Sequence, residues 1–423
     1  MEPPAPTPPR QEADRSLTIV LVVSPRLLRS ALVFLVVCGL CAFVVRTYAL
    51  AYDPVYGWTK MIVFGQDFAD RTLPRLQRLT HYTETSEGGH GGYDGQFYAQ
   101  LALDVSLRDP EFARSLDMPA YRARRIGLPA TAFVLGGFKP RRVLQAYALG
   151  NLFFWFVLLG ALYRLLRPRT VRALLCLCGG CLCSGAIASM ERSLVDLPTT
   201  ALLVAGLAAG SLGGYALLAA AALTRETSVL AAAGFWDGRL PWREGGSWKR
   251  GLAVLAAAAV PLAAWLLYVN FRLGHDTQAG VGNFALPLYA MGARLVEQCH
   301  RLAAIGGGNF FHHFFRGDWL YTHYATFELL TILTTFFQGL FLVLRRDWRS
   351  PFWRVGASYL LLGSVLGPAV WDDTSAAARV LLPMTVCFYL QLARERGRGW
   401  FWTFLVLGSL SVPFAVHDFW QGI

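Results

Sequence analysis

Long uncharged apolar stretches alternate with short polar connections along most of this chain. A helix needs roughly 17–25 predominantly apolar residues to cross the hydrocarbon core of a bilayer. Runs near this length occur at 30–45, 143–163, 173–190, 197–224, 251–271, 329–344, 355–371, 380–393 and 399–416. The pattern therefore predicts an all-α polytopic membrane protein.

Two apolar segments depart from this simple pattern. The run 197–224 is 28 residues long, and Arg225 and Glu226 separate it from a further apolar piece at 227–236. One upright helix would be too long for the bilayer, so we interpret 197–236 as a tight helical pair with its outer turn near these charges. The run 126–138 has only 13 residues and is predicted as a half-span or interfacial helix. The total is about 11 transmembrane helices.

The polar segments suggest one integral domain with two long outer loops. Residues 1–27, Pro-rich at their start, are predicted as a disordered cytoplasmic tail, and 28–423 as a single membrane domain. The first outer loop would cover 51–142 and the second 272–326. We expect amphipathic helices on the membrane surface in the first loop, for example at 110–125.

Composition and charge support this class of protein. The chain has 423 residues, 55% of them hydrophobic and only 16% charged, which is too apolar for an ordinary soluble domain. The net charge is +12, and the charged residues lie between apolar segments and are not clustered in a soluble module that could bind nucleic acid. With the N-terminus inside, the cytoplasmic pieces carry 19 Lys or Arg against 7 Asp or Glu. This bias predicts the orientation and gives no reason to expect a nucleic-acid partner.

One polar stretch on the first outer loop has the composition of an active site. Residues 88–98 read GGHGGYDGQFY, with Asp94 among glycines and aromatic residues. A carboxylate can take the proton of an attacking hydroxyl, and aromatic faces can stack on sugars. We therefore expect Asp94 to be catalytic and Tyr93, Gln96 and Tyr98 to contact substrate. The alternative is that Asp94 only caps the helix that follows.

A second acidic motif, MERSLVDLP, ends the third apolar run. Glu191 and Asp196 could hold substrate hydroxyls or a metal, and Arg192 could hold a phosphate. The alternative is ordinary helix-end chemistry, because Asp196 before Pro198 could cap the next helix.

Three further charged residues lie in or beside apolar sequence. Arg225 and Glu226 are costly inside a membrane, which makes them candidates for substrate binding. The alternative is a mutual ion pair that braces their turn. Arg379 could bind phosphate or extend to the interface, while Asp372 and Asp373 could simply solvate their loop.

No residue is assigned as a metal ligand. The cysteine run at 176–183 is expected to be packing, and His312 and His313 are interpreted as part of an interfacial aromatic belt. A divalent cation, Mg²⁺ or Mn²⁺, stays open as a cofactor.

The arrangement of these motifs resembles the GT-C superfamily of integral membrane glycosyltransferases. The shared features are one spanning helix, a long outer loop with an acidic motif (YDGQFY), an outer acidic motif after the third span (ERSLVD) and a later TRE turn. Bacterial members with a YDGQFY-type loop are the most similar. In this chain that loop is followed by Asp117, Pro119, Tyr121, Arg122, Arg124 and Arg125.

The resemblance implies an inverting transfer of a sugar from a polyprenyl-phosphate carrier to a lipid-linked or glycan acceptor. Asp94 would be the base or would orient the acceptor, and Arg124 and Arg125 would be among the basic residues near the carrier phosphate. The expected location is a bacterial inner membrane, in contact with membrane lipids, with the active site on the extracytoplasmic side. No paired DE or DxD motif stands in the first loop, so the resemblance does not supply a metal site.

Two other functions stay open from the sequence. A glycolipid transporter or flippase would also be polytopic, although its polar groups usually lie at mid-membrane on broken helices. A membrane subunit that binds a glycolipid without catalysis would need the same pocket as an enzyme.

Overall fold

The computed structural model describes residues 25–83, 92–236, 247–275, 280–304 and 319–421. Regular structure in these residues is almost entirely helical, as the apolar periodicity predicts. The strands described are β1 (Phe64–Gly65) and β2 (Tyr82–Thr83), which pair in parallel with Phe64 opposite Tyr82. The all-α class is therefore confirmed for the described part of the chain.

Five helical segments in these ranges are long and apolar enough to cross a membrane. They are Leu27–Leu50, Pro140–Leu166, Val171–Glu191, Gly251–Leu273 and His323–Leu344. Two bent pairs would raise the number to seven: Thr374–Val380 with Leu382–Leu392, bent by 61°, and Arg398–Leu407 with Val412–Gln421, bent by 45°. These helices support a membrane protein, but the expected count of about 11 is not confirmed.

The run 197–224 shows why the count is lower. It folds as α9 (Asp196–Ala209) and α10 (Ser211–Thr224), which turn at Gly210 with φ +63° and pack closely on each other. Each has 14 residues and is about 21 Å long, shorter than a hydrocarbon core of about 30 Å. The pair was predicted, but its turn was misplaced. Arg225 instead lies at the C-terminal end of α10, where its side chain contacts Asp196 at the start of α9.

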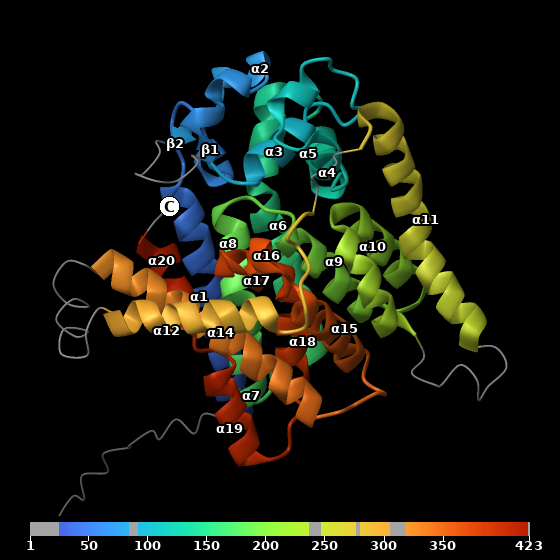
Figure 1. The fold of residues 1–423 in the computed structure, drawn as a ribbon. Coiled ribbons are helices and arrows are strands. Elements are labelled where there is room, and N and C mark those ends of the chain that lie inside the picture. The colour runs from blue at the N-terminus through green and yellow to red at the C-terminus, as the bar shows by residue number, and fades with distance from the viewer. Residues whose placement is uncertain (1–24, 84–91, 237–246, 276–279, 305–318, 422–423) are drawn as a thin grey trace, which may run out of the picture.

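Residues 51–83 and 92–138 fold into a cap over one end of the helices, at the top of Figure 1. Its short elements, besides the two strands, are η1 (Thr59–Ile62), η2 (Gln66–Arg71), α2 (Pro74–Gln77), α3 (Gly95–Leu101), η3 (Phe112–Ser115), α4 (Pro119–Ala123) and α5 (Gly127–Leu135). The expected surface helix at 110–125 is replaced by η3 and α4. Phe112 and Leu116 are buried there against Phe97 and Val269, because the loop has its own apolar cluster.

The helices below the cap form the main core. In chain order they are α1 (Pro25–Leu50), α6 (Pro140–Leu166), α7 (Val171–Leu182), α8 (Ser184–Glu191), α9, α10, η4 (Glu226–Phe235) and α11 (Ser247–Leu273). The rest are α12 (Tyr289–Ala304), α14 (Trp319–Leu344), α15 (Pro351–Val365), α16 (Pro368–Trp371), α17 (Thr374–Val380), α18 (Leu382–Leu392), α19 (Arg398–Leu407) and α20 (Val412–Gln421). Segment 126–138 contains only the nine residues of α5, so it is too short to span, as expected.

Several basic connections meet at the end of the molecule opposite the cap (Figure 1). Arg345 pairs with Glu395 at 2.8 Å, and Arg172 donates to the Glu395 carbonyl at 3.3 Å. Arg354 donates to the Trp236 carbonyl at 2.5 Å. Within the described residues, these basic connections lie away from the cap.

Candidate active site

A cavity of about 290 Å³ lies where the cap meets the helices. Its wall comes from α3, α4, α9, α10 and α17, together with residues 280–283 and α16. The charged residues that line it are Asp94, Arg122, Arg125, Asp196, Arg225 and Arg379. Residues nearly 300 positions apart in sequence therefore face one space.

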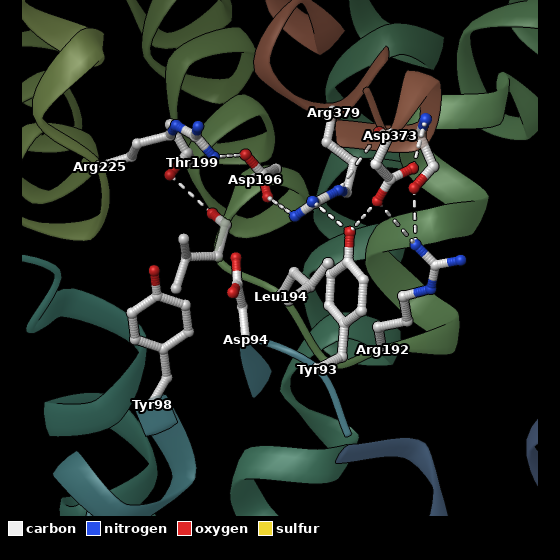
Figure 2. Close-up of polar contacts among 12 residues, drawn as sticks. Tyr93, Asp94, Tyr98, Arg192, Leu194, Asp196, Thr199, Arg225, Asp373 and Arg379 are labelled. Atoms are coloured by element: carbon white, nitrogen blue, oxygen red, sulfur yellow. Dashed lines mark hydrogen bonds and ion pairs between the residues drawn. The ribbon is translucent and has the colours of Figure 1, made fainter. Parts of the chain in front are cut away.

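The YDG turn places Asp94 at the N-terminus of α3. Asp94 occupies the N-cap position of this helix, but its side chain makes no capping hydrogen bond. A Cβ on Gly95 would lie 2.3 Å from the Arg192 carbonyl oxygen and 2.8 Å from that of Ile62, so only glycine allows the turn to dock here. The side chain of Asp94 is left to point toward the cavity (Figure 2).

Arg122 holds the Asp94 carboxylate. Its Nη1 lies 2.8 Å from Oδ1 of Asp94, while Nε and Nη2 bind Asp117 at 2.9 and 2.6 Å. Burial opposes ionisation of Asp94, but the guanidinium groups of Arg122, Arg379 and Arg125 outweigh it and lower the pKa. Asp94 is therefore ionised at neutral pH, and about a third of its side chain (32%) stays exposed.

A second arginine is fixed by Glu226 behind the cavity wall and by two tyrosines that line the cavity. Arg125 donates to both carboxylate oxygens of Glu226 at 3.1 and 3.0 Å, and to the hydroxyls of Tyr98 and Tyr121. Burial opposes ionisation of Glu226, but Arg125 outweighs it and lowers the pKa of Glu226 to about 2. Glu226 thus pairs with Arg125 and not with Arg225, so the alternative of a mutual ion pair at the TRE turn is wrong.

Asp196 is the centre of a buried ionic cluster. Its carboxylate pairs with Arg225 on one oxygen and with Arg379 at 3.4 Å on the other, and only 1% of the side chain is exposed. It does not cap α9, whose N-cap is Val195. Burial, followed by the like charge of Arg125, lowers the pKa of Arg225 to about 10, so the guanidinium keeps its charge at neutral pH.

Tyr93 connects this cluster to α17. Its hydroxyl donates to Asp373 at 2.5 Å and accepts from Arg379 at 2.7 Å (Figure 2). Arg192 lies with its guanidinium carbon 4.3 Å from the centre of the Tyr93 ring and donates to Ser375 at 2.6 Å. Tyr93 and Arg192 therefore position Arg379 and Asp373 and do not line the cavity themselves.

The charges are arranged in two layers. Four guanidinium groups but only two carboxylates line the cavity, whereas Asp117 and Glu226 bind Arg122 and Arg125 from behind and Asp373 is linked to Arg379 through the Tyr93 hydroxyl. The inner surface is thus electropositive, although the whole cluster is nearly neutral. Such a surface suits an anionic group such as a phosphate.

Comparison of the chain with protein-family models, with curated proteins and with solved structures finds no match in any of the three. The chemistry of the site therefore rests on its own geometry.

Some residues expected at the site lie elsewhere. Gln96 is buried and accepts from the Gly65 amide at 3.2 Å, so it joins α3 to β1. Arg124 stacks on Tyr121, and Glu191 ends α8; neither lines the cavity. His312 and His313, like Gly88–Gly91, lie outside the described residues.

Sequence reasoning also left out two residues that organise the site. Arg122 was noted only within the Asp-Pro-Tyr-Arg segment, but it is the direct partner of Asp94. Asp373 was interpreted as solvating its loop, yet it accepts from Tyr93 and its side chain caps α17 at the Ser375 amide, 2.9 Å away. The pair Asp372–Asp373, six to seven residues before Arg379, was the available signal.

Proposed function

We propose that this protein is an inverting glycosyltransferase that moves a sugar from a polyprenyl-phosphate carrier to a lipid-linked or glycan acceptor. The observation that carries the proposal is the Asp94 carboxylate, which faces the same cavity as four guanidinium groups. A base for a hydroxyl and a binding surface for a phosphate are the two groups that this transfer needs.

In the proposed reaction, the acceptor hydroxyl attacks the anomeric carbon of the donor sugar from the face opposite the phosphate. Its proton passes to Asp94 as the new C–O bond forms. The bond between the anomeric carbon and the phosphate oxygen breaks, and its electron pair leaves with polyprenyl phosphate. Arg225 and Arg379 are placed to stabilise the charge that grows on this leaving group.

The fixed arginines would lose little energy to reorganisation during the reaction. Arg379 is held by Asp196, Tyr93 and the Ser375 carbonyl, and Arg225 by Asp196. Preorganised donors aimed at developing charge are among the largest contributions to enzymatic catalysis. Asp196 is occupied by these two guanidinium groups, which supports a structural role for it over direct contact with sugar hydroxyls or a metal.

Donor binding would also strengthen the base. In the described structure Arg122, Arg379 and Arg125 lower the pKa of Asp94, which makes its carboxylate a weak proton acceptor. A phosphate on Arg379 would neutralise part of that positive charge, and the pKa of Asp94 would rise. Asp94 would then accept a proton readily only when the donor is in place.

The site lies at the cap end of the helices, which we assign to the extracytoplasmic side of a bacterial inner membrane. There a carrier lipid could keep its chain in the bilayer while its phosphate reaches the cavity. A divalent cation such as Mg²⁺ or Mn²⁺ is given no ligands in this proposal.

The proposal is tested with purified full-length protein in detergent and a panel of polyprenyl-phosphate hexoses and pentoses. Transfer to a lipid acceptor from one of these donors, lost in Asp94→Asn while donor binding persists, would support an enzyme. If the wild-type protein and Asp94→Asn bind the donor equally well and the wild-type protein transfers no sugar, the result would instead favour a non-catalytic glycolipid-binding subunit. Movement of the intact glycolipid across the bilayer of proteoliposomes, without transfer of its sugar, would favour a flippase.

A further inference from the structure

A cluster of two histidines and one aspartate joins α14 to α20, apart from the candidate active site. Nε2 of His323 lies 2.7 Å from Oδ1 of Asp418, and Nδ1 of His417 lies 3.3 Å from the same oxygen. One ligand atom from each side chain falls within 4.8 Å of the others. None of the three residues lines the cavity around Asp94.

The spacing of these atoms suits a small transition-metal ion. Zn²⁺ binds imidazole nitrogen at 2.0–2.1 Å and carboxylate oxygen at 2.0–2.2 Å, so neighbouring tetrahedral ligand atoms stand about 3.4 Å apart. The distance from His417 to Asp418 Oδ1, 3.3 Å, is close to this value, whereas the distance from His323, 2.7 Å, is that of a hydrogen bond and would have to lengthen. Shifts of a few tenths of an ångström to about 1 Å would open the cluster around an ion.

Packing on both helices limits how far these ligands can move. The His323 ring lies 5.1 Å from the ring of Phe414, and Phe419 is fully buried. Trp420 stacks on Phe43 with ring centres 5.8 Å apart, which anchors the end of α20 against α1. These contacts hold residues on either side of His417 and Asp418 and so preorganise the cluster.

The surroundings also leave room for a solvent ligand. The His323 side chain is only 9% exposed, but those of His417 and Asp418 are 41% and 38% exposed. One side of the cluster is therefore not covered by protein, which leaves a position for a water ligand, as in zinc sites with three protein ligands and a water. The amide of Gln421 lies 3.3 Å from the second ring nitrogen of His417 and could orient that ring.

We propose that His323, His417 and Asp418 bind one divalent transition-metal ion, for which Zn²⁺ has the best-matched chemistry. Two nitrogen donors and one carboxylate favour Zn²⁺ over the oxygen-seeking Mg²⁺ and Ca²⁺. The ion links α20 to α14 through residues that are nearly a hundred positions apart in the chain. This site does not depend on the proposed glycosyl transfer.

The test uses the full-length protein in detergent, stripped of metal with a chelator and then titrated with Co²⁺ and, by calorimetry, with Zn²⁺. The wild-type protein should bind one equivalent, with visible ligand-field bands for Co²⁺, and Zn²⁺ should raise its Tm. His323→Ala and His417→Ala should each lower the affinity at least tenfold. His275→Ala, at an exposed histidine after α11, is the matched control and should bind as the wild type does.

Asp418→Asn serves if the alanine variants fail to fold, because it keeps the size of the side chain and can still accept a hydrogen bond from His323. It should keep the metal-free Tm within a few degrees and lose the Zn²⁺-dependent rise. Unchanged Co²⁺ bands in Asp418→Asn, or no bound equivalent in the wild type, would show that the three residues are only a hydrogen-bonded contact between α14 and α20.

Discussion

The replacement Asp94→Asn separates catalysis from folding at this site. Asparagine keeps the size of the side chain but cannot take the acceptor proton. Arg122 loses one carboxylate partner, yet it keeps its bidentate pair with Asp117 at 2.9 and 2.6 Å. No guanidinium is left unpaired, and Asp94 is 32% exposed, so we expect a loss of stability of about 1 kcal/mol or less.

The expected loss of activity is much larger. A positioned general base contributes roughly 10²- to 10⁴-fold to a rate, which corresponds to about 3–5 kcal/mol in the barrier. The assay follows initial rates of sugar transfer from a polyprenyl-phosphate donor by mass spectrometry of the product. Thermal unfolding of the same preparation measures folding.

Asp109→Asn is the matched control, because Asp109 also pairs with an arginine of the cap, Arg75, at 2.9 Å, but it does not line the cavity. It should keep the transfer rate within about twofold of the wild type. A folded Asp94→Asn protein that transfers sugar at a third of the wild-type rate or faster would refute the role of Asp94.

The remaining predictions concern binding, stability, pH and orientation. Arg379→Ala should raise the KM for the donor roughly 10- to 100-fold and leave the KM for the acceptor nearly unchanged; equal effects on both would argue against phosphate binding. Asp196→Ala leaves two buried guanidinium groups without their shared carboxylate, so it should lower the free energy of unfolding by about 3–5 kcal/mol, measured as a fall in Tm; a shift of under 1 °C would contradict the buried pairing. The folded state lowers the pKa of Asp94, so ionised Asp94 stabilises the protein above the unfolded pKa near 3.9, and this stabilisation is lost as pH falls through the lower folded pKa. The pH profile of kcat/KM, which reports the free enzyme, should therefore show no acid limb from Asp94 above about pH 4. The acid limb of kcat, which reports the donor complex, should lie at higher pH. In whole cells, Val55→Cys in the exposed cap should react with an impermeant thiol reagent and Arg346→Cys, at the opposite end, only after permeabilisation, with the wild-type protein as background; the reverse pattern would invert the orientation.

The local character of the chain could be predicted from its order of residues. Apolar runs favour helices wherever they occur. Glycine at position 95 marks a turn in which a residue with a side chain would not fit. Asp94 could be singled out as a carboxylate among glycines and aromatic residues, and Arg225 because a charge within apolar sequence is costly. These inferences need only the preferences of a residue and its near neighbours.

Pairing could not be predicted in the same way. Arg225 pairs with Asp196 and Glu226 with Arg125, although Arg225 and Glu226 are adjacent in the chain, because α10 ends where α9 begins and the cap covers both. The breaks at Gly210 and Leu381 were likewise not evident from the apolar runs, and they leave five to seven candidate spans in the described residues.

The sequence by itself determined that this is a helical membrane protein with acidic and basic residues in its polar segments. Only the tertiary structure decided which of those charges share one cavity and which brace it from behind. The reason is physical: the energy of an ion pair depends on separation in space and on burial, and neither is encoded by separation along the chain.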